Sequence, residues 1–263
     1  MKHDMNIPAA VITLCLLLSP TICHGQTVAG ETVSRYEQPT LLTGTIYDSK
    51  SGPKRALYKF KRTVTRSGDT VKALREYTFP DGKVAARELA VYEGNNLVSY
   101  QLEELQINAR GDATVLRATN ATPKISFLYI SDLNTPDRAK TNSEELQPDT
   151  LVNDMIAPFL AAHWAQLIKG ETVKCRYIAA SRAETVGFKF AKVSESTHEG
   201  KPVVTIKMSA SSLIIAALVD PLFFTLEKDG THRVLQYEGR TTPKVRDGTN
   251  WKDLDAVTVF DWN

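Results

Sequence analysis

Three histidines follow the first 25 residues of the chain, at His163, His198 and His232. No two of them stand at a metal-ligand spacing, and the chain holds neither a His-Glu-x-x-His motif nor a Cys/His cluster. His163 falls on the apolar side of a predicted helix, where a core or cleft-lining histidine is favoured over a metal ligand or a general base. His198 is expected in an exposed turn, and His232 is expected, also exposed, at the start of a strand. The sequence therefore indicates no metal and no other cofactor.

Nucleophiles and carboxylates give equally weak signals. Cys175 could be a nucleophile or a dimer bridge, but a small buried side chain in a strand over residues 173–177 is favoured. Asp154 and Asp220 flank apolar segments and are candidate carboxylates at a cleft edge; stabilisation of a helix start and a turn with Pro221 are the favoured alternatives. No nucleophile elbow, phosphate-binding loop or dinucleotide fingerprint occurs. We therefore do not expect an enzyme, although a hydrolase with no recognisable motif stays open.

The first 25 residues have the layout of a secretory signal peptide. Lys2 precedes an apolar run over residues 7–18, a Ser-Pro pair then breaks any helix, and small residues stand three and one before a cut after Gly25. The run is short for a transmembrane span. We expect cleavage near Gly25 and export to the periplasm or the medium, with an uncleaved anchor as the alternative. The mature chain would have no transmembrane span and would keep Cys175 as its one cysteine, so it is not a disulfide-stapled scaffold.

Composition places the rest of the chain among ordinary globular proteins. Of the 263 residues, 42% are hydrophobic and 24% are charged, and 32 Lys and Arg against 30 Asp and Glu leave a net charge of +2. This balance gives no footprint for nucleic acid. We expect residues 26–40 to form a flexible lead-in and residues 41–263 to form a single β-rich domain.

From residue 41 the hydrophobic pattern has a period of two, which is typical of β-strands. Tyr58 and Phe60 share a face, residues 71–79 repeat the arrangement, and Gly-containing turns separate the stretches. We expect about nine to eleven antiparallel strands. Residues 131–150 are polar and are expected to form a long exposed loop that could act as a lid. Basic residues on the strands are expected on a solvated convex face, with contact to anionic lipid head groups as the alternative: Lys59, Lys61, Arg62, Lys207, Arg233, Arg240 and Lys244.

One amphipathic helix is predicted over residues 158–169. Pro158 suits a first helical turn, and Gly170 suits a C-terminal cap. Since a strongly curved sheet buries only its concave face, a helix lying in that face would complete the core. The expected fold class is therefore mainly β (α+β): a curved antiparallel sheet, or unclosed half-barrel, with one main amphipathic helix in the concave face and an apolar cleft between the two.

The most unusual segment is an uninterrupted apolar run over residues 213–219, which does not alternate as a one-faced strand would. It could form a short helix after Ser212 or a connection in the mouth of the barrel. With nearby aromatic residues it could line a pocket for a long apolar ligand, and plain core is the alternative. The candidate cleft residues are Phe159, His163, Trp164, Phe188, Phe190, Leu213, Ile214, Leu218 and Phe223.

The order of elements also carries a resemblance. The predicted order is a β-meander, a polar loop and the helix, followed by a turn at Lys169-Gly170-Glu171 into a strand. Three short motifs come after it, at Met208–Leu213, Asp220–Phe223 and Leu235–Gly239. This layout resembles a family of exported bacterial proteins of unknown function, over about residues 41–262. The family's expected fold is similar to the unclosed β-barrel of the lipoprotein carriers LolA and LolB. Because those carriers bind acyl chains in the barrel concavity beneath helical lids, the resemblance implies a lipid-binding cleft.

Three hypotheses about function follow. The first is an exported binding protein that sequesters or carries an apolar ligand, such as an acyl chain or a lipid, between the sheet and the helix. The second is a protein-interaction module of the cell envelope, in which the core is filled and an edge strand pairs with an envelope protein. The third is the hydrolase without a motif. A bound lipid would separate the first from the second.

Overall fold

The computed structural model describes residues 39–49, 55–217 and 219–262. The predicted signal peptide at residues 1–25 and the predicted lead-in up to residue 38 lie outside the described residues. None of the described helices is both long enough and apolar enough to cross a membrane.

Fifteen strands form one sheet, which we describe as two wings joined in the middle. The first wing runs through β1 (Leu41–Asp48), β2 (Ala56–Ser67), β3 (Thr70–Thr78), β4 (Val84–Glu93), β5 (Asn96–Glu104), β6 (Ala109–Leu116), β7 (Lys124–Ile130) and β8 (Lys140–Glu145). The second wing consists of β9 (Thr150–Leu151), β10 (Val173–Ala179), β11 (Glu184–His198), β12 (Lys201–Ala210), β13 (Leu222–Glu227), β14 (Val234–Arg240) and β17 (Asp255–Asp261). The short hairpin of β15 (Val245–Asp247) and β16 (Asn250–Lys252) stands apart.

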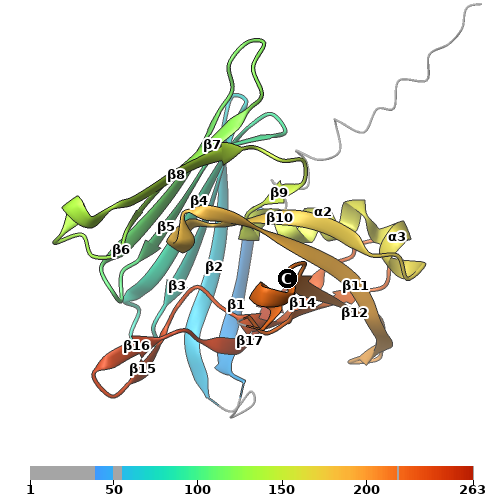
Figure 1. The fold of residues 1–263 in the computed structure, drawn as a ribbon. Coiled ribbons are helices and arrows are strands. Elements are labelled where there is room, and N and C mark those ends of the chain that lie inside the picture. The colour runs from blue at the N-terminus through green and yellow to red at the C-terminus, as the bar shows by residue number, and fades with distance from the viewer. Residues whose placement is uncertain (1–38, 50–54, 218, 263) are drawn as a thin grey trace, which may run out of the picture.

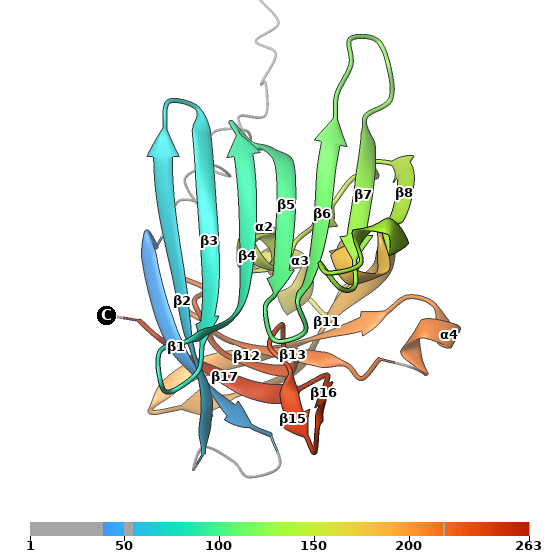
Figure 2. The same cartoon turned by 90° about the vertical axis from the view of Figure 1, so that its left-hand side faces the viewer.

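The wings meet where β1 pairs with β17, and the sheet ends at β8 on one side and at β9 on the other. Every pairing in the large sheet is antiparallel except that of β9 with β10. Figure 1 shows the first wing upright on the left and the second wing lying to its right, and Figure 2 shows the second wing beneath and behind the first. The predicted fold class, a mainly β protein with a curved, unclosed sheet, is confirmed.

Gly44 allows the close approach at the junction of the wings. It lies on β1 between Phe60 of β2 and Phe260 of β17, whose rings meet edge to face at 5.4 Å between centroids. A Cβ at this position would lie 2.6 Å from the carbonyl oxygen of Val259, closer than packed atoms approach. Glycine is therefore required by backbone proximity, since the neighbouring atom belongs to the main chain.

The structure holds more strands than the nine to eleven expected. The additional ones are short and polar: β9, β15 and β16 have two or three residues each, and β8 reads Lys-Thr-Asn-Ser-Glu-Glu. Hydrophobic alternation cannot reveal a strand that has almost no apolar residues. Residues 131–150, expected as a loop, are therefore largely exposed but include η2 (Pro136–Arg138) and β8, which pairs with β7 as a polar edge strand.

The predicted helix begins earlier than expected and is interrupted. A 3₁₀ turn, η3 (Asn153–Met155), leads into α2 (Ile156–Ala162), and α3 (Trp164–Ile168) follows. His163 separates the two because its backbone (φ −102°, ψ 15°) is not helical. Gly170 ends the segment with φ +88°, as the sequence predicts.

Candidate ligand-binding site

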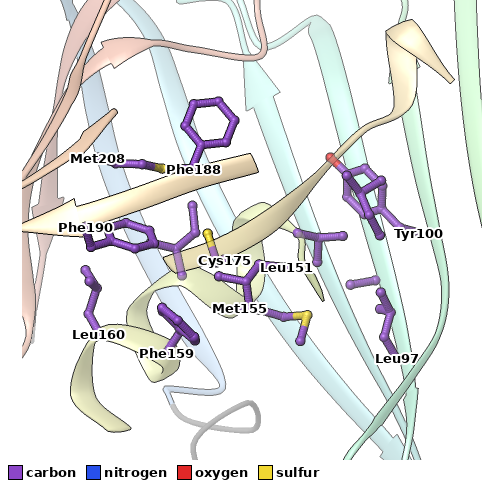
Figure 3. Close-up of a cluster of buried hydrophobic side chains, with 14 of the residues drawn as sticks. Leu97, Tyr100, Leu151, Met155, Phe159, Leu160, Cys175, Phe188, Phe190 and Met208 are labelled. Carbon is purple, nitrogen blue, oxygen red and sulfur yellow. The ribbon is translucent and has the colours of Figure 1, made fainter. Parts of the chain in front are cut away.

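The main hydrophobic core lies between the concave faces of both wings and the two short helices. Phe159 of α2 and Phe188 and Phe190 of β11, three of the predicted cleft residues, are buried together in it. The rings of Phe159 and Phe190 lie 5.6 Å apart, and Phe190 continues to Phe224 of β13 at 6.2 Å. Figure 3 shows Phe159 and Leu160 below β10 and β11, with Leu97 and Tyr100 of β5 on the opposite side of the cluster.

His163 and Trp164 lie at the edge of this core, partly buried. The ring of His163 stacks against Phe159 at 4.3 Å, and its Nδ1 is 3.0 Å from the carbonyl oxygen of Phe159. Trp164 stacks on His232 at 4.1 Å, so His232 is covered rather than exposed as expected. His198 lies exposed at the end of β11, as predicted. His163 and His232 therefore act as packing groups at the helices.

The remaining predicted cleft residues do not join this cluster. Ile214, in the short helix α4 (Leu213–Ala216), is 78% exposed, whereas its neighbour Ile215 packs against the core. Phe223 alternates with the buried Phe224 along β13 and therefore lies on the outer face, beside Lys207 and Glu238. The side chain of Leu213 and all of Leu218 lie outside the described residues.

A cavity of about 330 Å³ lies at one edge of the core, beside α2. Its apolar lining includes Leu97, Leu151, Met155 and Phe159, all buried in the core. Its polar lining consists of Asn95, Asn96, Arg117, Gln147, Asp149, Thr150 and His163, and Leu146, Pro148, Pro158 and Ala162 complete it. The predicted residues Phe159 and His163 thus border a real hollow.

A second hollow of about 450 Å³ lies between the edge of the second wing and α4. It is bordered by Arg176 and Thr185 on one side and by Ser211 and Ile215 on the other. Arg176 already donates to the hydroxyl of Thr185 through Nε at 2.8 Å, so its charge is engaged in holding neighbouring strands together.

Ionisable side chains on the concave face were missed by the sequence interpretation. Arg62, expected on the convex face, is buried and donates from Nε to Oδ1 of Asp154 at 2.5 Å. The hydroxyl of Tyr92 donates to Oδ2 of the same carboxylate at 3.1 Å. Asp154, expected to stabilise a helix start, therefore ties η3 and α2 to β2 through a buried ion pair. Lys244, also expected on the convex face, is half-buried and lies 3.1 Å from Glu104.

Glu88 of β4 is the second buried carboxylate of the concave face, with 1% exposure. Its Oε1 accepts from the hydroxyl of Tyr77 at 2.8 Å and from Nδ2 of Asn153 at 2.9 Å, and the hydroxyl of Thr242 donates to it as well. The hydroxyl of Tyr177 donates to Oδ1 of Asn153 at 2.7 Å, which connects β10 of the second wing to this network. Neutral donors therefore satisfy Glu88.

Arg75 of β3 lies opposite Glu88, next to this network. Its Nε is buried and has no hydrogen-bond partner among the residues that the structure describes. Burial opposes its charge, but Tyr77, Glu88 and Asp154 nearby outweigh burial and raise its pKa, so the guanidinium stays charged. Burial raises the pKa of Tyr100 well above its usual value, which keeps that phenol protonated and able to donate.

A signal for these residues was present in the strand pattern. Arg62 occupies the inward parity of Tyr58, Phe60 and Val64, and Arg75 occupies that of Ala73 and Tyr77. In a strand whose alternate residues are apolar, a charged residue at an apolar position indicates a buried charge.

Two observations concern metal ligands and the candidate nucleophile. No three His, Cys, Asp or Glu side chains come together as a metal site within the described ranges. Cys175 is buried at 6% exposure, and burial raises the pKa of its thiol to about 12, so it is protonated at neutral pH and a poor nucleophile.

The chain was compared with protein families, curated proteins and solved structures. No family model matches it, and no curated protein matches it. Among solved structures, a beta-barrel-like protein of the domain of unknown function DUF1849 from Brucella abortus matches 84% of this chain and 95% of its own chain. The TM-score is 0.37 and the sequence identity is 8%.

Proposed function

We propose that this chain is a binding protein that holds an apolar ligand, such as an acyl chain, between α2 and the concave face of the sheet. The observation that carries the proposal is the 330 Å³ cavity beside α2, whose buried apolar wall meets a polar rim. Small-molecule sites have this composition, and this volume falls within their usual range. The wall would provide affinity by burying methylene groups, each worth about 0.8 kcal/mol.

Export is part of the proposal and depends on the first 25 residues alone, whose pattern is that of a signal peptide. The competing hypothesis, an envelope module that adds a partner strand to its edge, would use β8. That strand is rich in polar and charged residues, a composition that protects sheet edges from pairing, so ligand binding is favoured.

Native mass spectrometry of the protein purified from its own compartment, followed by solvent extraction, tests the proposal directly. A reproducible adduct that extracts as lipid is expected. A clean apoprotein mass, together with no uptake of added fatty acid or phospholipid, would refute it.

Substitution at the cavity locates the ligand. Ala162 is exposed and lines the cavity, whereas Ala157 is exposed on the same helix and does not. Ala162→Trp should fill the hollow and raise the Kd for a fluorescent fatty acid by about tenfold or more, equal to about two buried methylenes. Ala157→Trp is the matched control and should leave the Kd unchanged. Equal Kd values for both variants would place the ligand elsewhere.

A further inference from the structure

Arg75 occupies the centre of a charged row on the concave face. The ladder pairs Arg62 of β2 with Arg75 of β3, and Arg75 with Glu88 of β4. Directly opposed side chains of opposite charge usually pair. Arg75 and Glu88 are opposed in this way but do not form an ion pair, because Glu88 is held by neutral donors. Arg62, on the other side of Arg75, carries the same charge and is itself paired with Asp154.

The guanidinium of Arg75 is positioned with its hydrogen-bond donors unused. Its carbon lies 5.1 Å from the centre of the Phe60 ring, so one face of the group is covered. In the described part of the chain it makes no ion pair and no hydrogen bond, and its Nε is shielded from solvent. Buried donors without acceptors are rare and costly, so such a group calls for a specific explanation.

Tyr100 of β5 presents a second donor in the same region. It is 4% exposed, and within the described residues its hydroxyl makes no hydrogen bond. It stands opposite Ala90 of β4, one row along from Glu88, which places it two strands from Arg75, about 12 Å away at the backbone. Both side chains are long enough to reach one group between them.

Solvent reaches this part of the interior. Arg75 itself is only partly buried, and so are several side chains of both wings that pack against the core: Leu102, Tyr129, Tyr177, Leu222 and Tyr237. Tyr177 and Tyr237 interact electrostatically with Arg75 and Glu88, so the second wing faces the charged row. Aromatic side chains of both wings thus lie near a charged donor that has no hydrogen-bond acceptor among the described residues.

We propose that Arg75 and Tyr100 form an anion-binding site between the wings that takes the carboxylate of an apolar or aromatic acid. The planar guanidinium matches a carboxylate with two parallel hydrogen bonds, and the phenol adds a third donor. The neighbouring carboxylates Glu88 and Asp154 favour a singly charged group over a doubly charged phosphate. This site is separate from the cavity beside α2 and does not depend on the function proposed for it.

Titration calorimetry with four probes tests the site: dodecanoate, methyl dodecanoate, dodecanol and benzoate. The wild-type protein should bind dodecanoate at least about tenfold more tightly than the ester or the alcohol, since only the acid offers a charged acceptor. Comparable binding of benzoate would identify compact organic acids as ligands, and binding of dodecanoate alone would identify fatty acids. Equal affinity for acid and ester, or no binding of either acid, would overturn the proposal.

Variants assign the preference to residues. Arg75→Met should abolish the preference for acid over ester, Arg75→Lys should keep part of it, and Lys72→Met, on the outer face of the same strand, should keep all of it. Tyr100→Phe removes a hydroxyl that makes no hydrogen bond, so it should fold normally and reduce the preference about threefold. A full preference in folded Arg75→Met and in Tyr100→Phe would overturn the proposal.

Ala162→Trp separates the two proposals. It fills the cavity beside α2 and leaves Arg75 in place, so the ratio of acid to ester affinity should survive in this variant. If Ala162→Trp loses acyl binding at α2 but still binds the acid more tightly than the ester, both sites are supported. Loss of the preference itself in Ala162→Trp would show that the carboxylate binds beside α2, and would overturn the separate site.

Discussion

Replacing Arg62 by methionine removes one partner of the buried ion pair and leaves the other without compensation. The side chains of Arg62 and Asp154 are 8% and 2% exposed, and the contact is 2.5 Å. Arg62 also donates to the carbonyl oxygen of Pro39 at 2.6 Å. After the substitution the Asp154 carboxylate would keep only the donor from Tyr92 among the contacts described above. Breaking a buried pair from one side typically costs about 3–5 kcal/mol.

That free energy converts to a large thermal shift. For a chain of this size, 1 kcal/mol lowers the Tm by about 2–4 °C, so Arg62→Met should lower it by about 10 °C. Because the pair anchors the start of α2 to β2, amide exchange in residues 156–162 should also accelerate more than exchange in β12. Differential scanning calorimetry and hydrogen-exchange mass spectrometry measure the two effects.

The matched control is Arg110→Met. Arg110 pairs with Asp112 on the same wing at 2.8 Å, but its side chain is 42% exposed, and an exposed pair contributes about 0–1 kcal/mol. Combining Arg62→Met with Asp154→Leu removes both charges and should recover part of the loss, since an apolar pair can replace a buried ionic one. If Arg62→Met and Arg110→Met lower the Tm equally, the buried pair does not anchor the helix and the reasoning fails.

Three further experiments test other parts of the fold. Cys175 should resist a thiol reagent at pH 8 in the folded protein and react fully in denaturant, because burial raises the pKa of its thiol to about 12; rapid labelling of the native protein would contradict its burial. Phe190→Ala should cost about 3–5 kcal/mol in urea unfolding, whereas Phe223→Ala, on the outer face, should cost about 1 kcal/mol, and equal losses would refute this assignment of faces. Gly44→Ala should lower the Tm by several degrees, because its methyl group would meet the backbone oxygen of Val259 at 2.6 Å, and an unchanged Tm would show that the wings can separate at little cost.

Local pattern was enough to predict the longer strands and the helical segment. Residues 56–67 and 70–78 alternate clearly, and both are strands of the first wing. The ends of the sheet escaped prediction because β8 and β9 are defined by backbone pairing and carry no apolar alternation. The break at His163 also depends on its backbone dihedral angles, which the helical spacing of neighbouring residues does not reveal.

The candidate site was predicted less completely, for a physical reason. Composition and spacing identify which side chains are apolar, and the three predicted residues Phe159, Phe188 and Phe190 lie in one buried cluster. Whether such residues surround a hollow or fill it depends on packing between segments far apart in sequence. The cavity beside α2 is bordered by Leu97 and Arg117 of the first wing, which no local pattern connects to the helix.

The concave face combines a packed apolar core with a charged row. Fold stability is a sufficient explanation for the first of these but not for the second. A packed cluster needs no function to explain it, because burial of its side chains stabilises the fold by itself. Charged groups are different: replacing a buried ionic group by apolar side chains is often neutral or stabilising, so stability alone is a weak reason for Arg75 to be there. Its position beside a satisfied Glu88, with Tyr100 nearby, is better explained by an acceptor that arrives from outside the chain. For this reason the interior between the wings, as well as the cavity at α2, is where a ligand should be sought.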